Sequence, residues 1–155
     1  MKHLYWMVDG VLAGRCGPCS EPWDLAQLKQ SGIGAVVSLC EVAGDLSVFA
    51  DAGLEHLYLP MARNVPPTDA DLQIAADIMQ RSLGWIAERE LRGVPVLVHC
   101  SLGNDRTGLL LASYLMMQGA APVHAVSQVR SYRDAAFTAE GWDQFVYDVL
   151  YSIQS

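Results

Sequence analysis

The sequence predicts an α/β domain in which a mostly parallel central sheet of four to five strands is flanked by helices. Short apolar, β-rich runs alternate along the chain with segments of helical periodicity, which is typical of a parallel sheet. The chain has 155 residues and is 52% apolar, so it can bury one sizeable core, and no linker-like segment divides it. We therefore expect a single domain over residues 1–155.

Five runs are predicted as strands: Tyr5 to Val8, Val11 to Ala13, Ala35 to Leu39, His56 to Leu59 and Val94 to His99. Five segments are predicted as helices: residues 21–31, Asp69 to Leu91, Thr107 to Gln118, Pro122 to Tyr132 and Ala139 to Ile153. The expected N-caps of the first, second and last helix are Ser20, Thr68 and Thr138. Ligands of such sheets bind beyond the carboxyl ends of the strands, so the turn after the fifth strand is the first place to look for a site.

Charge and hydropathy exclude several classes of partner. The formal charge is −7, and no run of basic residues could follow a phosphate backbone, so neither nucleic acid nor an anionic membrane is expected. No apolar stretch reaches the roughly 18 residues of a membrane span, and Asp9 interrupts the N-terminal apolar run that would begin a signal peptide. Four cysteines without a secretory signal indicate reduced thiols and a cytoplasmic location.

The turn after the fifth predicted strand carries a chemical motif. It reads His99-Cys100-Ser101-Leu102-Gly103-Asn104-Asp105-Arg106-Thr107-Gly108. A strand, a tight loop and a helix N-terminus form an anion cradle, because loop amides converge there and the helix dipole is positive. Arg106 can bind two phosphate oxygens with its guanidinium fork. A thiol in this field loses its proton, so we expect Cys100 to be a thiolate nucleophile, with the Ser101 or Thr107 hydroxyl stabilising the sulfur when it leaves.

These residues match the signature His-Cys, five residues, Arg-Thr-Gly, and the chain thereby resembles the cysteine-dependent protein tyrosine phosphatase superfamily. Four further segments resemble the small atypical dual-specificity phosphatases: Val11–Gly14, Gly34–Leu39, Leu57–Pro60 and Arg130–Thr138. The resemblance implies a dual-specificity phosphatase-like fold and hydrolysis of phosphomonoesters through a phosphocysteine. It also implies that no metal or other cofactor takes part, and that the substrate is a phosphorylated protein or a small aryl phosphate.

The general acid is where the sequence departs from this family. Relatives usually carry an aspartate shortly after the strand that ends at Pro60, and here Arg63 occupies that place. Asp69 and Asp71 lie past the prolines that follow, where they could instead serve as carboxylates of a helix N-terminus. Asp105 lies directly before the loop arginine, as does an aspartate in the myotubularin and Sac-type lipid phosphatases, and this resemblance implies that Asp105 is a second candidate for the acid. Its alternatives are an exposed loop carboxylate or a partner for a neighbouring arginine.

Arg63 itself has two interpretations, a contact for a second anionic group of the substrate or a solvated surface arginine. An absent or misplaced acid should slow poor leaving groups most, so aryl phosphates are expected to react faster than alkyl phosphates. His99 is expected to orient the loop through hydrogen bonds rather than to bind metal. No pair of histidines has ligand spacing, and no metal site is predicted.

The other cysteines give weaker signals. Cys40 resembles the cysteine-glutamate strand end of phosphatases of regenerating liver, which implies a reversible Cys40–Cys100 disulfide. The alternative is a small core hydrophobe. The segment Cys16-Gly17-Pro18-Cys19 copies the thioredoxin tetrapeptide, but a loop with two free thiols is expected here.

Two rival functions remain open at this point. One is a phosphate-binding module with negligible turnover, in which the cradle is kept while the altered acid loop disables catalysis. The other is a rhodanese-like sulfurtransferase, which also places a cysteine in a loop that closes on a helix N-terminus. A sulfurtransferase loop, however, does not require the Arg-Thr-Gly ending found here.

Overall fold

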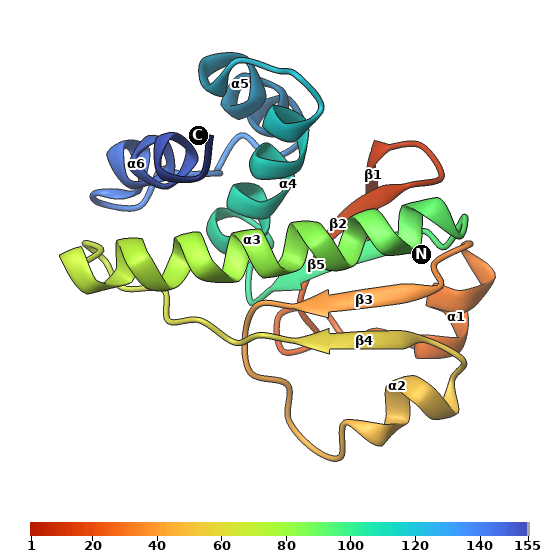
Figure 1. Ribbon diagram of the computed structural model, residues 1–155. Coiled ribbons are helices and arrows are strands. Elements are labelled where there is room, and N and C mark those ends of the chain that lie inside the picture. Colours follow the sequence, from red (N-terminus) through yellow and green to blue (C-terminus); the bar gives the residue numbers. More distant parts are fainter. Residues whose placement is uncertain (155) are drawn as a thin grey trace.

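The computed structural model describes residues 1–154 of the chain. Within them lie five strands: β1 (Tyr5–Val8), β2 (Leu12–Cys16), β3 (Ala35–Ser38), β4 (Glu55–Tyr58) and β5 (Val96–Cys100). The helices of the same region are α1 (Leu25–Gln30), α2 (Ser47–Asp51), α3 (Asp69–Leu91), α4 (Asp105–Met117), α5 (Pro122–Tyr132) and α6 (Trp142–Gln154). The predicted α/β fold is confirmed (Figure 1).

The strands form one sheet in the order β1-β2-β5-β3-β4. Only β1 is antiparallel to its neighbour, because a short turn joins it to β2, whereas β2, β5, β3 and β4 run parallel. Strand β5 lies in the centre and pairs with β2 on one side and with β3 on the other. The carboxyl ends of these parallel strands therefore meet at one edge, which is where the turn after β5 begins.

Helices cover both faces of the sheet (Figure 1). Alternate residues of β5 point to opposite faces, so Val96 and Val98 pack in the core shared with α3, α4, α5 and α6, while Leu97 packs toward α1 and α2. The larger core includes the fully buried Trp142, and the smaller one includes the fully buried Phe49. Burial on both faces explains why the parallel strands are apolar throughout.

The N-terminal cap of α3 is confirmed. Thr68 Oγ1 accepts a hydrogen bond from Asp71 N at 3.3 Å, and Asp71 Oδ2 accepts one from Thr68 N at 2.7 Å, which completes a capping box. The hydrogen bond from Thr68 N, and then those from the Asn64 side chain, lower the pKa of the Asp71 carboxyl. Asp71 is therefore a capping carboxylate.

Two other predicted caps are wrong. Asp24, not Ser20, caps α1 by accepting from Ala26 N at 2.9 Å. The helix begins later than predicted because Gly17 and Ser20 bind the carbonyl of Ser101, in the turn after β5. Thr138 donates to Ala135 O at 2.7 Å inside a turn, and α6 begins three residues later than predicted, at Trp142.

One helix begins earlier than predicted, and one helix was not predicted. Helix α4 begins at Asp105, two residues earlier than expected, so the motif arginine lies within the helix. The five-residue α2 was not predicted, because only Phe49 of its residues is buried and a single apolar position has no period.

Candidate active site

The turn between β5 and α4 presents a set of unpaired backbone amides. The N–H groups of the six residues from Ser101 to Arg106 donate to no carbonyl or side chain within residues 1–154. The Ser101 carbonyl is held from outside, because it accepts from Gly17 N at 3.0 Å and from Ser20 Oγ at 2.7 Å. Free amides at the start of a helix attract anions. The turn therefore has the character of an oxyanion cradle.

Glycine at position 103 is required by the close approach of this turn to β2. Gly103 has a φ of +76°, and a Cβ there would lie 2.8 Å from Cys16 N and 2.9 Å from the carbonyl carbon of Arg15. Gly17 makes a matching approach, since its Cβ would lie 2.5 Å from Cys100 O. Backbone thus packs directly on backbone, and residues 15–17 support the turn.

Cys100, the last residue of β5, is 2% exposed. Its Sγ accepts a hydrogen bond from Thr107 Oγ1 at 3.0 Å, and Thr107 is fixed in the first turn of α4. A cavity of about 330 Å³ opens in front of the thiol and is lined by Arg63, Cys100, Ser101, Leu102, Asn104, Asp105 and Arg106. A hydroxyl that donates to sulfur stabilises its anionic form, both as nucleophile and as leaving group.

The Arg106 guanidinium is only partly satisfied by the protein. Its Nη1 donates to Met61 O at 2.9 Å, and its Nη2 donates to Ser101 Oγ at 3.3 Å. Its Nε is buried and has no hydrogen-bond partner within residues 1–154. An unpaired buried N–H is costly, so this donor is suited to bind an acceptor atom of a ligand. The edge formed by Nε and Nη2 suits two oxygens of a tetrahedral oxyanion.

Asp105 and Arg63 form an ion pair at the wall of the same cavity. Arg63 Nε donates to Asp105 Oδ2 at 2.7 Å, and Phe137 N donates to Asp105 Oδ1 at 2.8 Å. Asp105 is 2% exposed, whereas the Arg63 side chain is 34% exposed. Each carboxylate oxygen is thus engaged as an acceptor, which favours the interpretation of Asp105 as a partner of a neighbouring arginine. A role of Asp105 as general acid stays a prediction.

Asp69 lies apart from these groups. It is the first residue of α3, it is exposed, and it is not among the residues that line the cavity. The structure therefore gives no geometric support to Asp69 as general acid, and its position fits a carboxylate that faces the helix dipole.

A third arginine, Arg133, holds the outer side of the turn. Its Nε and Nη2 donate to Asn104 Oδ1 at 3.1 and 2.7 Å, and its Nη2 also donates to Leu102 O at 3.0 Å. Sequence reasoning did not single out this residue, nor the contact of Ser20 described above. Both contacts join positions far apart in the chain, so only the fold reveals them.

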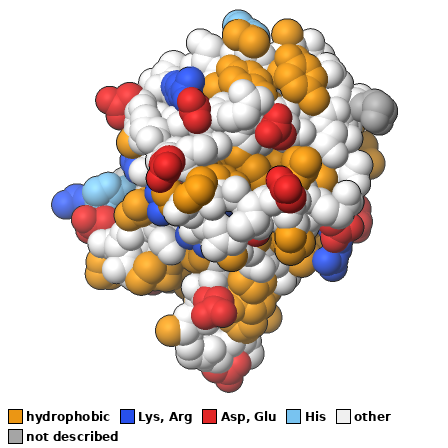
Figure 2. Space-filling model, turned by 90° about the vertical axis from the view of Figure 1, so that its left-hand side faces the viewer, with side chains coloured by type: hydrophobic (Ala, Val, Ile, Leu, Met, Phe, Trp, Pro, Cys, Tyr) orange, Lys and Arg blue, Asp and Glu red, His pale blue; other side chains and the backbone are white. Residues whose placement is uncertain are grey.

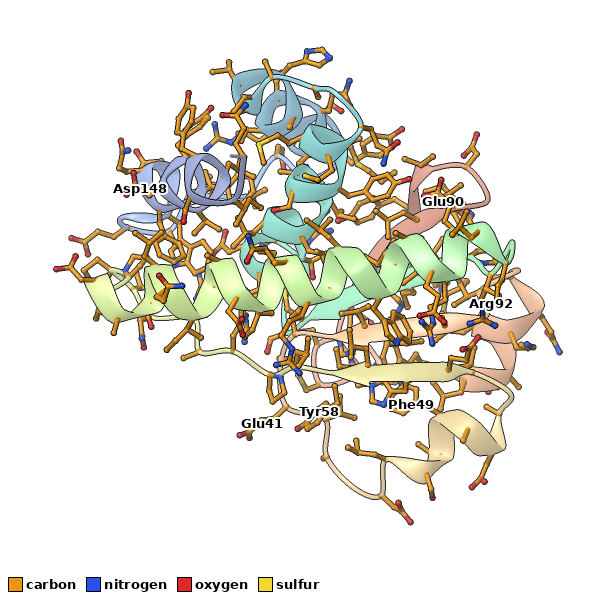
Figure 3. The ribbon with its side chains drawn as sticks, viewed as in Figure 1. Glu41, Phe49, Tyr58, Glu90, Arg92 and Asp148 are labelled. Atoms are coloured by element: carbon orange, nitrogen blue, oxygen red, sulfur yellow. The ribbon has the colours of Figure 1, made fainter. Side chains whose placement is uncertain are left out.

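His99 lies behind the turn in a buried network. Its Nε2 is 2.6 Å from Ser38 Oγ, which is also 2.8 Å from His56 Nε2, and its Nδ1 is 3.4 Å from Cys100 O. Phe49 stacks on the His56 ring with 3.7 Å between ring centroids (Figure 3). Burial lowers the pKa of each histidine to about 4, so both are neutral at pH 7.

Cys40 lines an adjoining cavity of about 410 Å³ together with Glu41, Pro60, Met61, Ala62, Ser101 and Arg106. Its Sγ is 4.0 Å from His99 Nδ1. Burial, and then the nearby Cys100 thiol, raise the pKa of the Cys40 thiol. Cys40 therefore lies close to the cradle, and the predicted Cys40–Cys100 disulfide stays a prediction.

Two observations concern metals and membranes. Among residues 1–154, no group of three His, Cys, Asp or Glu side chains is arranged to hold a metal ion. No helix in this part of the chain is long and apolar enough to cross a bilayer.

A buried thiol, an unpaired arginine edge and free amides around one turn of this fold define the class of cysteine-dependent protein tyrosine and dual-specificity phosphatases. Residues 14–120 match the family described as "Polymorphic toxin system, DSP-PTPase phosphatase", and the chain belongs to this family. The superfamily predicted from the motif is confirmed. The rival sulfurtransferase interpretation is not favoured.

Individual relatives agree with this assignment. The chain is 30% identical over 125 residues to the dual specificity protein phosphatase CDC14C of Symphalangus syndactylus, covering 73% of this chain and 24% of that protein. It is 30% identical over 112 residues to a probable protein tyrosine phosphatase type IVA B of Dictyostelium discoideum, covering 72% of this chain and 66% of that protein. The chain thus spans about a quarter of the CDC14C protein.

A solved structure resembles the whole chain. The crystal structure of Tk-PTP in the active form has a TM-score of 0.80 and 25% sequence identity, and the match covers 99% of this chain and 97% of that one. Human DUSP28, at a TM-score of 0.76 and 18% identity, shares the fold.

Proposed function

We propose that this chain hydrolyses phosphomonoesters through a phosphocysteine at Cys100, with aryl phosphates as its better substrates. The observation that carries the proposal is the buried Nε of Arg106, which has no partner within residues 1–154 and lies beside the unpaired amides of the turn. Together these donors fit the oxygens of a phosphoryl group, and the thiol lies in the same cavity.

The reaction has two displacements at phosphorus. In the first, the Cys100 thiolate forms the S–P bond while the P–O bond to the leaving group breaks, and the leaving oxygen then takes a proton. In the second, water attacks phosphorus, the S–P bond breaks, and inorganic phosphate is released. The Thr107 hydroxyl, 3.0 Å from Sγ, stabilises the sulfur anion at the start and at the end of the cycle.

The natural substrate in this proposal is a phosphotyrosine-containing protein or a small aryl phosphate in the cytoplasm. The net charge of −7 opposes binding to nucleic acid or anionic membranes. Figure 2 views the molecule from the side toward which β3 and β4 point. Acidic side chains are scattered over this face, and the basic ones form no continuous band. The proposed chemistry requires no metal.

The test is vanadate-sensitive hydrolysis of phenyl phosphate. We expect turnover by the wild type and its loss, to below detection, in Cys100→Ser, because a neutral hydroxyl replaces the thiolate. The matched control is Cys19→Ser, at an exposed cysteine, which should keep wild-type activity. A wild type that binds vanadate but does not turn over phenyl phosphate would instead favour a phosphate-binding module.

A further inference from the structure

Arg63 places a second cation at the mouth of the active-site cavity. Its side chain lines the cavity together with Cys100 and Arg106, and it is 34% exposed. It comes from the segment between β4 and α3, not from the turn that holds the phosphoryl group. A substrate that extends from the scissile phosphate along this side of the cavity therefore passes close to a guanidinium.

One edge of this guanidinium is fixed and the other is free. Arg63 Nε donates to the buried Asp105 at 2.7 Å, and Asp105 is itself held by Phe137 N at 2.8 Å. The Nη1 and Nη2 atoms of Arg63 donate to nothing else in residues 1–154. These two nitrogens form a planar fork, which is the geometry that binds carboxylate or phosphate with two parallel hydrogen bonds.

The backbone around Arg63 is anchored on both sides. Met61 O accepts from Arg106 Nη1 at 2.9 Å, and Asn64 O accepts from Trp142 Nε1 at 2.9 Å. The Asn64 side chain also donates to the Asp71 carboxylate at 2.8 and 3.0 Å. A ligand that binds the Arg63 fork therefore has little backbone to order, which lowers the entropic cost of binding.

The two sides of Arg106 differ in charge. The cavity on the Cys100 side carries Arg63 together with its buried partner Asp105, which occupies only the Nε edge of the guanidinium. The adjoining cavity on the Cys40 side carries Glu41, which lies past the carboxyl end of β3 (Figure 3) and has no cationic partner within residues 1–154. A negatively charged extension of the substrate is attracted toward Arg63 and repelled by Glu41. The orientation of a doubly anionic substrate is thereby selected.

We propose that Arg63 forms a second anion subsite, and that the enzyme prefers phosphomonoesters with another negatively charged group close to the scissile phosphate. This inference rests on the proposed phosphatase function. The shared chemistry is a carboxylate or phosphate within reach of the Arg63 fork. Its source is either an acidic residue next to phosphotyrosine in a protein or a second anion on a small aryl phosphate.

The test uses two substrate pairs whose members are closely similar in shape and differ in charge, and each preference is read against that of Arg63→Gln, which cancels any difference in leaving group. The first is 3-carboxyphenyl phosphate against 3-carbamoylphenyl phosphate, and the second is a phosphotyrosine peptide flanked by Glu against the same peptide flanked by Gln. We expect kcat/KM of the wild type to favour the charged member about fivefold, the size of a partly exposed ion pair. The preference should fall to about one in Arg63→Gln and should weaken with added salt.

The matched control is Arg81→Gln, an exposed arginine on α3 outside the cavity, which should keep the wild-type preference. A preference in either pair supports the subsite and identifies the source of the anion. Equal rates within both wild-type pairs would overturn it. An Arg63→Gln variant that slows charged and neutral substrates by the same factor would also overturn the subsite, because Arg63 would then act on the leaving group common to both substrates.

Two additions keep the test decisive. Arg63→Gln leaves the buried Asp105 without its cation, so the double variant Arg63→Gln/Asp105→Asn, which removes both charges, is measured beside it. Calorimetric binding of the first pair to Cys100→Ser needs no turnover. If no substrate is hydrolysed, the proposed function fails, while a charge preference in binding that depends on Arg63 still supports the subsite.

Discussion

Two segments meet at the carboxyl edge of the sheet, and only one of them carries the full signature predicted from the sequence. The turn after β5 carries the signature from His99 to Gly108 and is held by β2, by α4 and by Arg133. The segment between β4 and α3 is mostly exposed and carries Arg63 at the position where the family resemblance leads us to expect an acid. The turn therefore supplies the groups that capture the phosphoryl group, while the β4–α3 segment supplies no carboxylate to the cavity for protonation of the leaving group.

The largest effect expected from this contrast is a dependence on the leaving group. An intact cradle supports formation of the phosphocysteine, but no carboxylate on the β4–α3 segment lines the cavity to protonate a poor leaving oxygen. General acid catalysis is worth roughly 10² to 10⁴ in rate, so kcat/KM for aryl phosphates should exceed that for phosphoserine by about this factor. Steady-state rates over a panel of leaving groups measure it.

The pH dependence of kcat/KM, measured for variants on a substrate of the same panel, decides between the candidate acids. Asp105→Asn should leave the alkaline limb of the pH profile in place if the ion pair with Arg63 is its whole role, and Asp69→Asn should do so as well. Loss of the limb in Asp105→Asn would identify that residue as the acid. Equal rates on aryl and alkyl phosphates in the wild type would show that a proton donor is present after all.

A second experiment probes how firmly the cradle is seated on β2. Gly103→Ala combines a positive φ with a Cβ placed 2.8 Å from backbone, so we expect a loss of about 2–5 kcal/mol in the free energy of unfolding and a loss of vanadate binding. Gly93 also has a positive φ, of +70°, but has open space around it, so Gly93→Ala should cost only about 1–2 kcal/mol. Urea unfolding of both variants checks this, and equal losses would mean that the turn is not packed on β2.

The smallest expected effect concerns the histidines behind the cradle. Burial lowers the pKa of His99 and His56 to about 4, below the ordinary 6.5, so between these values the unfolded chain binds more protons than the folded one. Stability should therefore be full above pH 6.5 and fall as the pH drops toward 4, with His99 contributing at most about 3 kcal/mol.

Urea unfolding at pH 7 and pH 5 measures this dependence. His56→Gln should flatten it in part, and His124→Gln, at an exposed position on α5, should not change it. A free energy of unfolding that is the same at both pH values would contradict neutral buried histidines.

The sequence predicted the sheet and the cradle well, because both depend on local signals. Apolar runs define buried strands, and the signature from His99 to Gly108 lies on one short segment that must turn from a strand into a helix. The capping box at Thr68 was also readable, since its two partners are three residues apart.

The remaining features depend on contacts between distant positions. Serine is a residue type that favours the N-cap of a helix, but the Ser20 hydroxyl instead donates to Ser101 O, 81 positions away. The ion pair of Arg63 with Asp105 joins positions 42 residues apart, so the sequence offered an arginine partner only as one alternative, and Asp105 remained one of three candidate acids. Competition between local and distant partners for the same polar group is what a single sequence does not reveal.

Two hydrogen bonds from the C-terminal part of the chain hold the turn, one from Phe137 N to Asp105 and one from Arg133 to Asn104. They matter for the choice of an expressed fragment. A fragment trimmed to the family match at residues 14–120 would discard both of these C-terminal supports, as well as β1 and the first two residues of β2. Such a fragment would retain every signature residue while losing the scaffold that orients them. A protein expressed for binding or kinetic studies should therefore extend beyond residues 14–120 on both sides.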